Sequence, residues 1–131
     1  MFFTSVIYAQ TGMITVNITQ IDVEGGGKVK IGIYDRSGFL DVGKEVIGVD
    51  IKVAEQSITY DFNNIPVGKY AIAVFQDKNN DDILNKNLFG APKEPHGFSK
   101  NKYGMFGPPD FKDISFDVRK GQSISLKINL E

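Results

Sequence analysis

Residues 13–18 read MITVNI, and this stretch decides the fold. Its apolar side chains occupy alternate positions, at Ile14, Val16 and Ile18. A period of two residues is that of a half-buried β-strand, because successive side chains point to opposite faces of a sheet. The segment therefore predicts a strand that packs on a core with one face only.

The same alternation recurs along the chain after a turn predicted at Gly25-Gly26-Gly27. The six later strands are expected within residues 29–33, 47–53, 58–62, 70–75, 114–118 and 124–130. Short alternating runs rich in β-branched residues are typical of an antiparallel sandwich or barrel. We expect an all-β fold: a seven-stranded antiparallel β-sandwich, immunoglobulin-like or transthyretin-like, with one long loop between strands five and six.

The composition indicates one domain and excludes several function classes. The chain has 131 residues and no cysteine, which excludes disulfides, thiolate metal sites and cysteine nucleophiles. Its 15 Lys and Arg residues balance 16 Asp and Glu residues, with a net charge of -1. Nucleic-acid binding needs a concentrated basic surface, so no nucleic-acid partner is expected. We also expect no transmembrane segment, because no internal stretch approaches the roughly 20 apolar residues that a membrane helix needs.

Residues 1–12, MFFTSVIYAQTG, resemble the end of a secretory signal peptide. An apolar run reaches Ala9-Gln10, as in an h-region followed by a cleavage site, although the basic n-region is missing. The alternative is an ordinary first strand. We expect residues 1–12 to be a signal-peptide remnant, residues 13–131 to be the domain, and the protein to be exported to the periplasm or the extracellular surface.

Residues 77–113 interrupt the alternation with a segment dense in Asp, Asn, Gly and Pro. Connections of this length inside a domain are usually functional or disordered. The segment opens with Asp77-x-Asn79-x-Asp81, which spaces oxygen ligands at alternate positions as a calcium loop does. Continuing the count, Ile83 would offer a backbone carbonyl at the seventh position and Asn85 stands at the ninth.

Two departures weaken the match to a calcium loop. Asp82 stands where such a loop has glycine, although Asp tolerates the left-handed conformation better than most residues. Leu88 stands where the bidentate glutamate belongs, so Glu94 becomes the candidate for the missing carboxylate. The sequence predicts a Ca²⁺ site of modest affinity with the ligands Asp77, Asn79, Asp81, Ile83, Asn85 and Glu94. The alternative is that these residues only cap an Asx-rich turn.

Other residues of the segment allow different interpretations. A catalytic hypothesis makes Ser99 a nucleophile and His96 its base, with Asp110 or Glu94 orienting the imidazole ring, although the spacing is unspecific. The favoured interpretation is a loop histidine that hydrogen-bonds backbone. The aromatic residues and one methionine are expected to anchor the loop on the sandwich, with a sugar or peptide platform as the alternative. They are Phe89, Phe98, Tyr103, Met105, Phe106 and Phe111.

A family resemblance rests on residues 68–77, GKYAIAVFQD, and on scattered positions that follow them. These positions are Asn79, Asp81, Leu84, Asn85, Gly90, Pro92, Glu94, Gly97-Phe98-Ser99, Asn101, Gly107 and 109–111. Together they resemble a bacterial domain of unknown function, number twenty-one forty-one in words, over roughly residue 13 to the C-terminus. The resemblance implies a small exported β-sandwich with no assigned activity. The chain departs from the family pattern at Asp82, Asn85 and His96, where glycine, Asp and an aromatic residue are usual.

These observations lead to one leading functional hypothesis and two alternatives. The leading one is a non-enzymatic exported binding or envelope-associated module whose long loop is ordered by Ca²⁺. Its partner would be a protein or carbohydrate ligand at the cell envelope. The first alternative is a hydrolase acting on a sugar or ester with Glu94, His96 and Ser99. The second is a purely structural interaction domain without metal.

Overall fold

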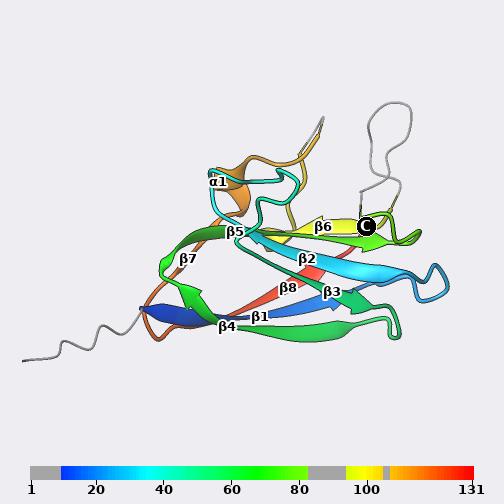
Figure 1. The fold of residues 1–131 in the computed structure, drawn as a ribbon, viewed down its shortest axis with the longest axis horizontal. Coiled ribbons are helices and arrows are strands. Elements are labelled where there is room, and N and C mark those ends of the chain that lie inside the picture. The colour runs from blue at the N-terminus through cyan, green and yellow to red at the C-terminus, as the bar shows by residue number, and fades with distance from the viewer. Residues whose placement is uncertain (1–9, 83–93, 105–106) are drawn as a thin grey trace, which may run out of the picture.

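The alternating stretch at residues 13–18 forms the centre of β1 (Thr11–Thr19), whose side chains alternate between buried and half-buried. The computed structural model describes residues 10–82, 94–104 and 107–131, and in these residues the fold is all-β with two sheets (Figure 1). β1 begins two residues before the predicted domain start. The predicted signal-peptide residues 1–9 lie outside the described part of the chain.

One sheet has three strands in the order β4–β1–β8, and the other has the order β3–β2–β5–β6, with β7 also paired to β5. The bounds of the strands after β1 are β2 Lys28–Tyr34, β3 Ile47–Lys52, β4 Ile58–Pro66, β5 Gly68–Asp77, β6 His96–Phe98, β7 Phe116–Val118 and β8 Ser123–Asn129. Figure 1 shows the two sheets as facing layers, with β5 running along the whole length of the upper one.

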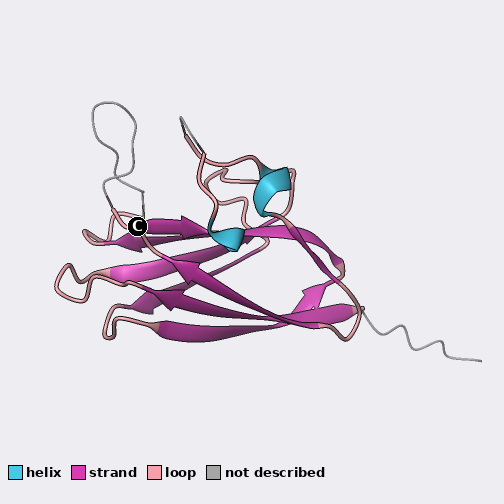
Figure 2. Cartoon of the chain, turned by 180° about the vertical axis from the view of Figure 1, so that it is seen from behind, coloured by secondary structure: helices cyan, strands magenta, loops and turns pink. Residues whose placement is uncertain are grey.

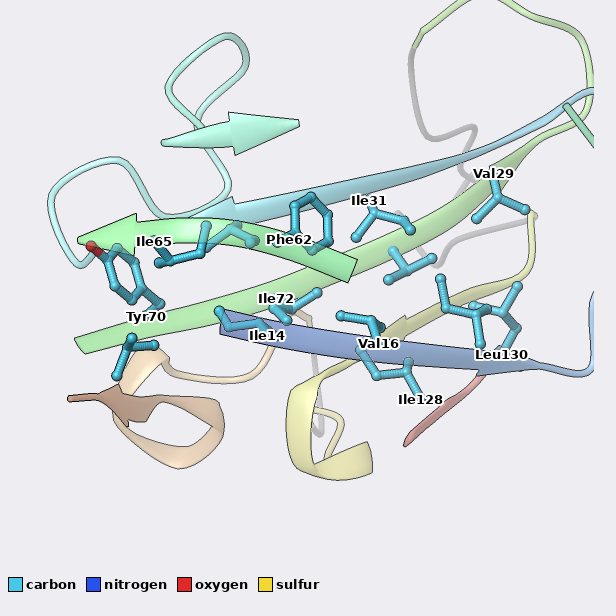
Figure 3. Close-up of a cluster of buried hydrophobic side chains, with 14 of the residues drawn as sticks. Ile14, Val16, Val29, Ile31, Phe62, Ile65, Tyr70, Ile72, Ile128 and Leu130 are labelled. Atoms are coloured by element: carbon cyan, nitrogen blue, oxygen red, sulfur yellow. The ribbon is translucent and has the colours of Figure 1, made fainter. Parts of the chain in front are cut away.

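The core fills the space between the two sheets (Figure 3). Ile14 and Val16 of β1 and Ile72 of β5 are fully buried, together with Ile31 of β2 and Ile128 of β8. Burying one such side chain contributes roughly 1.5–3 kcal/mol relative to leaving it in water. The inward residues are those that the alternation predicts, so the period of two explains which face of each strand is covered.

The predicted strand count and strand direction need correction. The described residues form eight strands rather than seven, because β6 lies inside the predicted long loop. β1 and β8 run parallel, so the expectation of a wholly antiparallel sandwich is wrong at this pair. Ile114, expected to begin a strand, instead ends the short helix α1 (Phe111–Ile114). Pairing between segments far apart in sequence leaves no local period, which is why β6 and the direction of β8 were not predicted. The four residues of α1 are too few to show a helical period.

The segment after β6 covers the outer face of the five-stranded sheet. A 3-10 helix (Ser99–Asn101) follows β6, and both helices lie on the same side of the molecule (Figure 2). Phe98, Phe111 and Ile114 form a second apolar cluster with Ala71 of β5. This cluster therefore covers the outer face of β5 around Ala71. Asp77, at the end of β5, lies outside the covered part.

Candidate metal centre

The candidate site lies where β5 ends and β6 begins. β5 and β6 pair antiparallel with Phe75 opposite His96, so the same register continued brings Asp77 opposite Glu94. One carboxylate oxygen each of Asp77, Asp81 and Glu94 lies within 4.8 Å of the others. The structure thus brings together the first and fifth positions of the predicted calcium loop and the distant carboxylate that was predicted to complete it.

Two of the three carboxylates are buried, and backbone amides contact both. Asp77 is 0% exposed, and its Oδ1 and Oδ2 accept hydrogen bonds from the amides of Asp81 (3.2 Å) and Asp82 (2.7 Å). Glu94 is 5% exposed, and its Oε2 accepts a hydrogen bond from the Lys78 amide at 2.7 Å. Hydrogen bonds of this kind offset part of the cost of burying a charge.

The turn after β5 has the backbone shape that wraps these donors around Asp77. Asn80 and Asp82 adopt left-handed conformations, with φ of 56° and 63°. Asp82 stands at the glycine position of a calcium loop, and its positive φ agrees with the predicted tolerance of Asp there. Asn79 lies beside the site, because its Nδ2 donates to Asp81 Oδ2 at 3.0 Å.

Lysine side chains from β2 flank the carboxylates. Lys28 is the register partner of Asp77, and its Nζ lies 4.0 Å from Asp77 Oδ2. Lys28 and Lys30 both bond Asp82, and both also lie within salt-bridge distance of Asp50. The hydrogen bond from Lys28, followed by that from Lys30, lowers the pKa of Asp82. The site therefore combines concentrated negative charge with lysine ammonium groups that partly compensate it.

The turn between β1 and β2 packs against the end of β5 that carries Asp77. A Cβ on Gly27 would lie 2.0 Å from the Asp77 carbonyl oxygen, so only glycine allows the two backbones to approach this closely. Gln76 is fully buried, and its Nε2 donates to the carbonyls of Asp22 (2.7 Å) and Gly26 (2.8 Å). Lys78 Nζ donates to Asp22 Oδ2 at 2.7 Å, and this bond is the main cause that lowers the pKa of Asp22.

Sequence reasoning identified only part of this site. Asp77, Asp81 and Glu94 lie together as predicted, and Asn79 contacts Asp81. Ile83 and Asn85 lie outside the described residues. Lys28 and Gln76 were missed, although the alternation of β5 places Gln76 on the inward face after Ile72 and Val74, where a polar side chain needs partners.

The contacts of His96 and Ser99 do not support the hydrolase hypothesis. Ser99 is fully buried, and its Oγ accepts from the Ile72 amide (3.1 Å) and donates to the Ile114 carbonyl (2.6 Å). His96 Nδ1 lies 3.3 Å from the Glu94 backbone oxygen, not from a serine. A serine whose hydroxyl donates a hydrogen bond to a backbone carbonyl stabilises the fold and has no base to activate it as a nucleophile.

The described aromatic residues of the segment anchor it. Phe98 and Phe111 are buried, and Tyr103 meets Phe98 and His96 edge to face. The Tyr103 hydroxyl lies 3.2 Å from the His96 carbonyl oxygen and 3.0 Å from that of Asn129, which joins the segment to the last strand. Phe89, Met105 and Phe106 lie outside the described residues.

Comparisons with known proteins give a family but no activity. A family model described as "Uncharacterized protein conserved in bacteria (DUF2141)" matches residues 16–125. No curated protein and no solved structure matches the chain. Among the described residues, no helix has the length and apolar character needed to cross a membrane.

Proposed function

The chain belongs to this uncharacterised bacterial family, as its sequence resemblance indicated, and we propose that it is a non-enzymatic binding or envelope-associated module with a Ca²⁺ site at the end of β5. The observation that carries the proposal is the convergence of Asp77, Asp81 and Glu94 within 4.8 Å. Glu94 is 17 residues from Asp77 in sequence, yet it supplies a carboxylate where the calcium-loop pattern lacks one.

The proposed ligands are oxygen atoms, which Ca²⁺ prefers, in a set of six to eight. Asp77, Asp81 and Glu94 supply charge, and the other predicted ligands are Asn79, Asn85 and the backbone carbonyl of Ile83. Lys28, with its Nζ 4.0 Å from Asp77 Oδ2, competes electrostatically with a bound cation. This competition supports a modest affinity, of the kind that suits the millimolar calcium of extracellular sites.

We assign the module to the periplasm or the cell surface, with a protein or carbohydrate ligand at the envelope as its partner. The apolar run that ends at Ala9-Gln10 and the modest affinity expected of the site support this location. We also assign the two-sheet fold to the immunoglobulin-like or transthyretin-like sandwiches. The Tyr70 hydroxyl donates to the Pro66 carbonyl at 2.7 Å, a contact similar to the tyrosine corner of immunoglobulin-like domains.

Thermal unfolding in excess EDTA and in CaCl₂ tests the proposed metal site. Calcium at about a hundred times its Kd would add roughly 2.7 kcal/mol of stability, which raises Tm by several degrees in a domain of this size. MgCl₂ at the same concentration is expected to shift Tm less, because Mg²⁺ requires a tighter octahedral geometry. A purely structural domain would show no shift with either ion.

Two matched variants locate the site. Asp81→Asn removes one proposed ligand charge at an exposed position, so it should reduce the calcium shift and leave the fold intact. Asp117→Asn makes the same charge change near the opposite end of β5, where Asp117 pairs with Lys69, and should leave the calcium shift unchanged. Equal calcium shifts in the two variants would contradict the proposed ligand set.

A further inference from the structure

The described strand edges differ in how they are protected against pairing with another chain. β4 carries a register shift opposite β1, a left-handed Asn64 and a terminal Pro66. Asn101 bonds the outer edge of β8 through the Lys127 carbonyl and the Asn129 amide. β6 exchanges backbone hydrogen bonds with Glu131, and β7 is only three residues long.

β3 has none of these protections within the described chain. Its pairing with β2 runs without a shift from Lys28 opposite Lys52 to Ile33 opposite Ile47, and it contains no proline. Regular edge strands are templates for pairing with another chain, and charged side chains such as Asp50 and Lys52 restrict that pairing to a partner of complementary charge. β3 is therefore the described edge best suited to accept a further strand.

The direction of the β3 backbone groups determines which residues can form hydrogen bonds with an added strand. The Val53 amide donates to the Gly27 carbonyl at 3.0 Å, and this pair continues the β2–β3 register. Alternate residues of an antiparallel strand bond to opposite sides. Val49, Ile51 and Val53 therefore bond β2, whereas Gly48, Asp50 and Lys52 present their amides and carbonyls to the open edge.

Charge complementarity favours a second copy of β3 as the strand that pairs with this edge. Lys52 lies opposite Lys28 of β2, a like-charge pair, and it forms no ion pair with the described residues. In an antiparallel pairing of β3 with a second β3, centred on Ile51, Asp50 stands opposite Lys52 of the second copy. Shifting that register by two residues in either direction places Asp50 opposite Asp50, or Lys52 opposite Lys52.

The inward face of β3 favours the same register. Val49, Ile51 and Val53 are only partly buried against the core, and Ile47 is 37% exposed. In the pairing centred on Ile51, Ile51 faces Ile51 and Val49 faces Val53 of the second copy. Cross-strand apolar pairs of this kind stabilise a sheet.

We propose that two copies of the chain associate through β3, in antiparallel register about Ile51, to join their five-stranded sheets around a two-fold axis. The interface is isologous: Asp50 pairs with Lys52 twice, and a row of apolar side chains lies beneath. The partner is thus a second copy of this chain.

Disulfide trapping tests the register directly, because the native chain has no cysteine. Ile51→Cys would place its thiol in a non-hydrogen-bonded pair with a Cα separation of about 4.5 Å, within disulfide range. Val49→Cys is the matched control from the same face of β3, and its two copies would lie about 13 Å apart. With mild oxidant, we expect a disulfide dimer for Ile51→Cys and little for Val49→Cys. Equal trapping of both variants, or of neither, would overturn the proposal.

Sedimentation equilibrium of the cysteine-free chain tests the charge pairs. Lys52→Glu replaces both attractive pairs by repulsive ones, so the dimer Kd should rise about tenfold or more. The same change removes the Lys28–Lys52 repulsion, so the stability of the monomer should not fall. Lys127→Glu on β8 makes an equal charge change and should leave the dimer Kd unchanged. A wild-type chain that stays monomeric at millimolar concentration would also overturn the proposal.

Discussion

The two ends of β5 bury polar groups in different ways. At the first end, the Tyr70 hydroxyl donates to the Pro66 carbonyl at 2.7 Å, a neutral contact that ties strand to turn. At the other end, the buried carboxylates of Asp77 and Glu94 accept hydrogen bonds from backbone amides and lie within 4.8 Å of Asp81. One end satisfies a neutral donor, whereas the other concentrates negative charge.

The two ends differ in whether their buried polar groups would gain from a bound ion. The donor of a buried hydroxyl is satisfied by one hydrogen bond to a carbonyl, so this contact does not require a bound ligand. Carboxylates held close together repel one another, and a cation between them would relieve that repulsion. We therefore interpret the Tyr70 end as architecture and the Asp77 end as a binding site, and four predictions test this division.

The largest effect is expected from Ile72→Ala, at the fully buried middle of β5. Loss of a core isoleucine costs about 2–5 kcal/mol of unfolding free energy through lost burial and a new cavity. Guanidinium unfolding measures this loss, and Val42→Ala, which truncates a 94% exposed valine, is the control. The calcium-induced increase in stability should survive in Ile72→Ala. Its disappearance would mean that the metal response depends on the fold as a whole and not on one end of β5.

Glu94→Gln should abolish most of the calcium-induced stabilisation, about 2.7 kcal/mol at a hundred times Kd. The amide oxygen can still accept the Lys78 hydrogen bond, so stability in EDTA should change less than the calcium response. Calcium titration followed by thermal unfolding separates the two quantities. Glu55→Gln, an exposed substitution of the same kind between β3 and β4, should behave as the wild type. A full calcium response in Glu94→Gln would remove Glu94 from the ligand set.

Tyr70→Phe should lower the unfolding free energy by about 1 kcal/mol, because the Pro66 carbonyl loses its donor. The calcium-induced shift should stay at the wild-type value, since this end of β5 holds no proposed ligand. Urea unfolding with and without CaCl₂ measures both. Tyr60→Phe is the control, because no hydrogen bond of its hydroxyl is among the described contacts. A changed calcium-induced shift in Tyr70→Phe would contradict the interpretation that only the Asp77 end of β5 responds to calcium.

The smallest effect is expected from the pH dependence of Asp82. Hydrogen bonds, first from Lys28 and then from Lys30, lower the pKa of this exposed carboxyl on folding. A carboxyl with a lowered pKa stabilises the fold above its unfolded pKa, about 3.9, and loses that contribution as pH falls through the folded pKa. Stability of the wild type and of Asp82→Asn, compared at pH 6 and below pH 4, should converge in acid. A difference that does not shrink would exclude the lysine contacts as its cause.

The sequence predicted most of the sheets because their strands are half-buried. In β1 and β2, alternation at Ile14, Val16 and Ile31 reports directly which face meets the core. β6 escaped prediction because its three residues carry no period, and its partners, β5 and Glu131, are distant in sequence. The parallel pairing of β1 with β8 is equally nonlocal.

The candidate site was predictable where its ligand residues follow a recognisable spacing in the sequence. Asp77 and Asp81 stand out by their spacing, and Glu94 followed from the missing glutamate of the loop pattern. Lys28 was not predictable, because only the register between β2 and β5 places it opposite Asp77. The contacts of Ser99 were not predictable for the same reason, because its hydroxyl joins Ile72 to Ile114 across the fold.

The most direct test of the central claim is a crystal structure of the full chain grown with CaCl₂. We expect an anomalous peak at about 2.3–2.6 Å from oxygens of Asp77, Asp81 and Glu94, the range of Ca²⁺–oxygen bonds. Crystals of Glu94→Gln grown in the same way should show a weaker peak or none. A wild-type structure in calcium with the three carboxylates bonded only to protein groups would contradict the account and leave Asp77 as a turn cap.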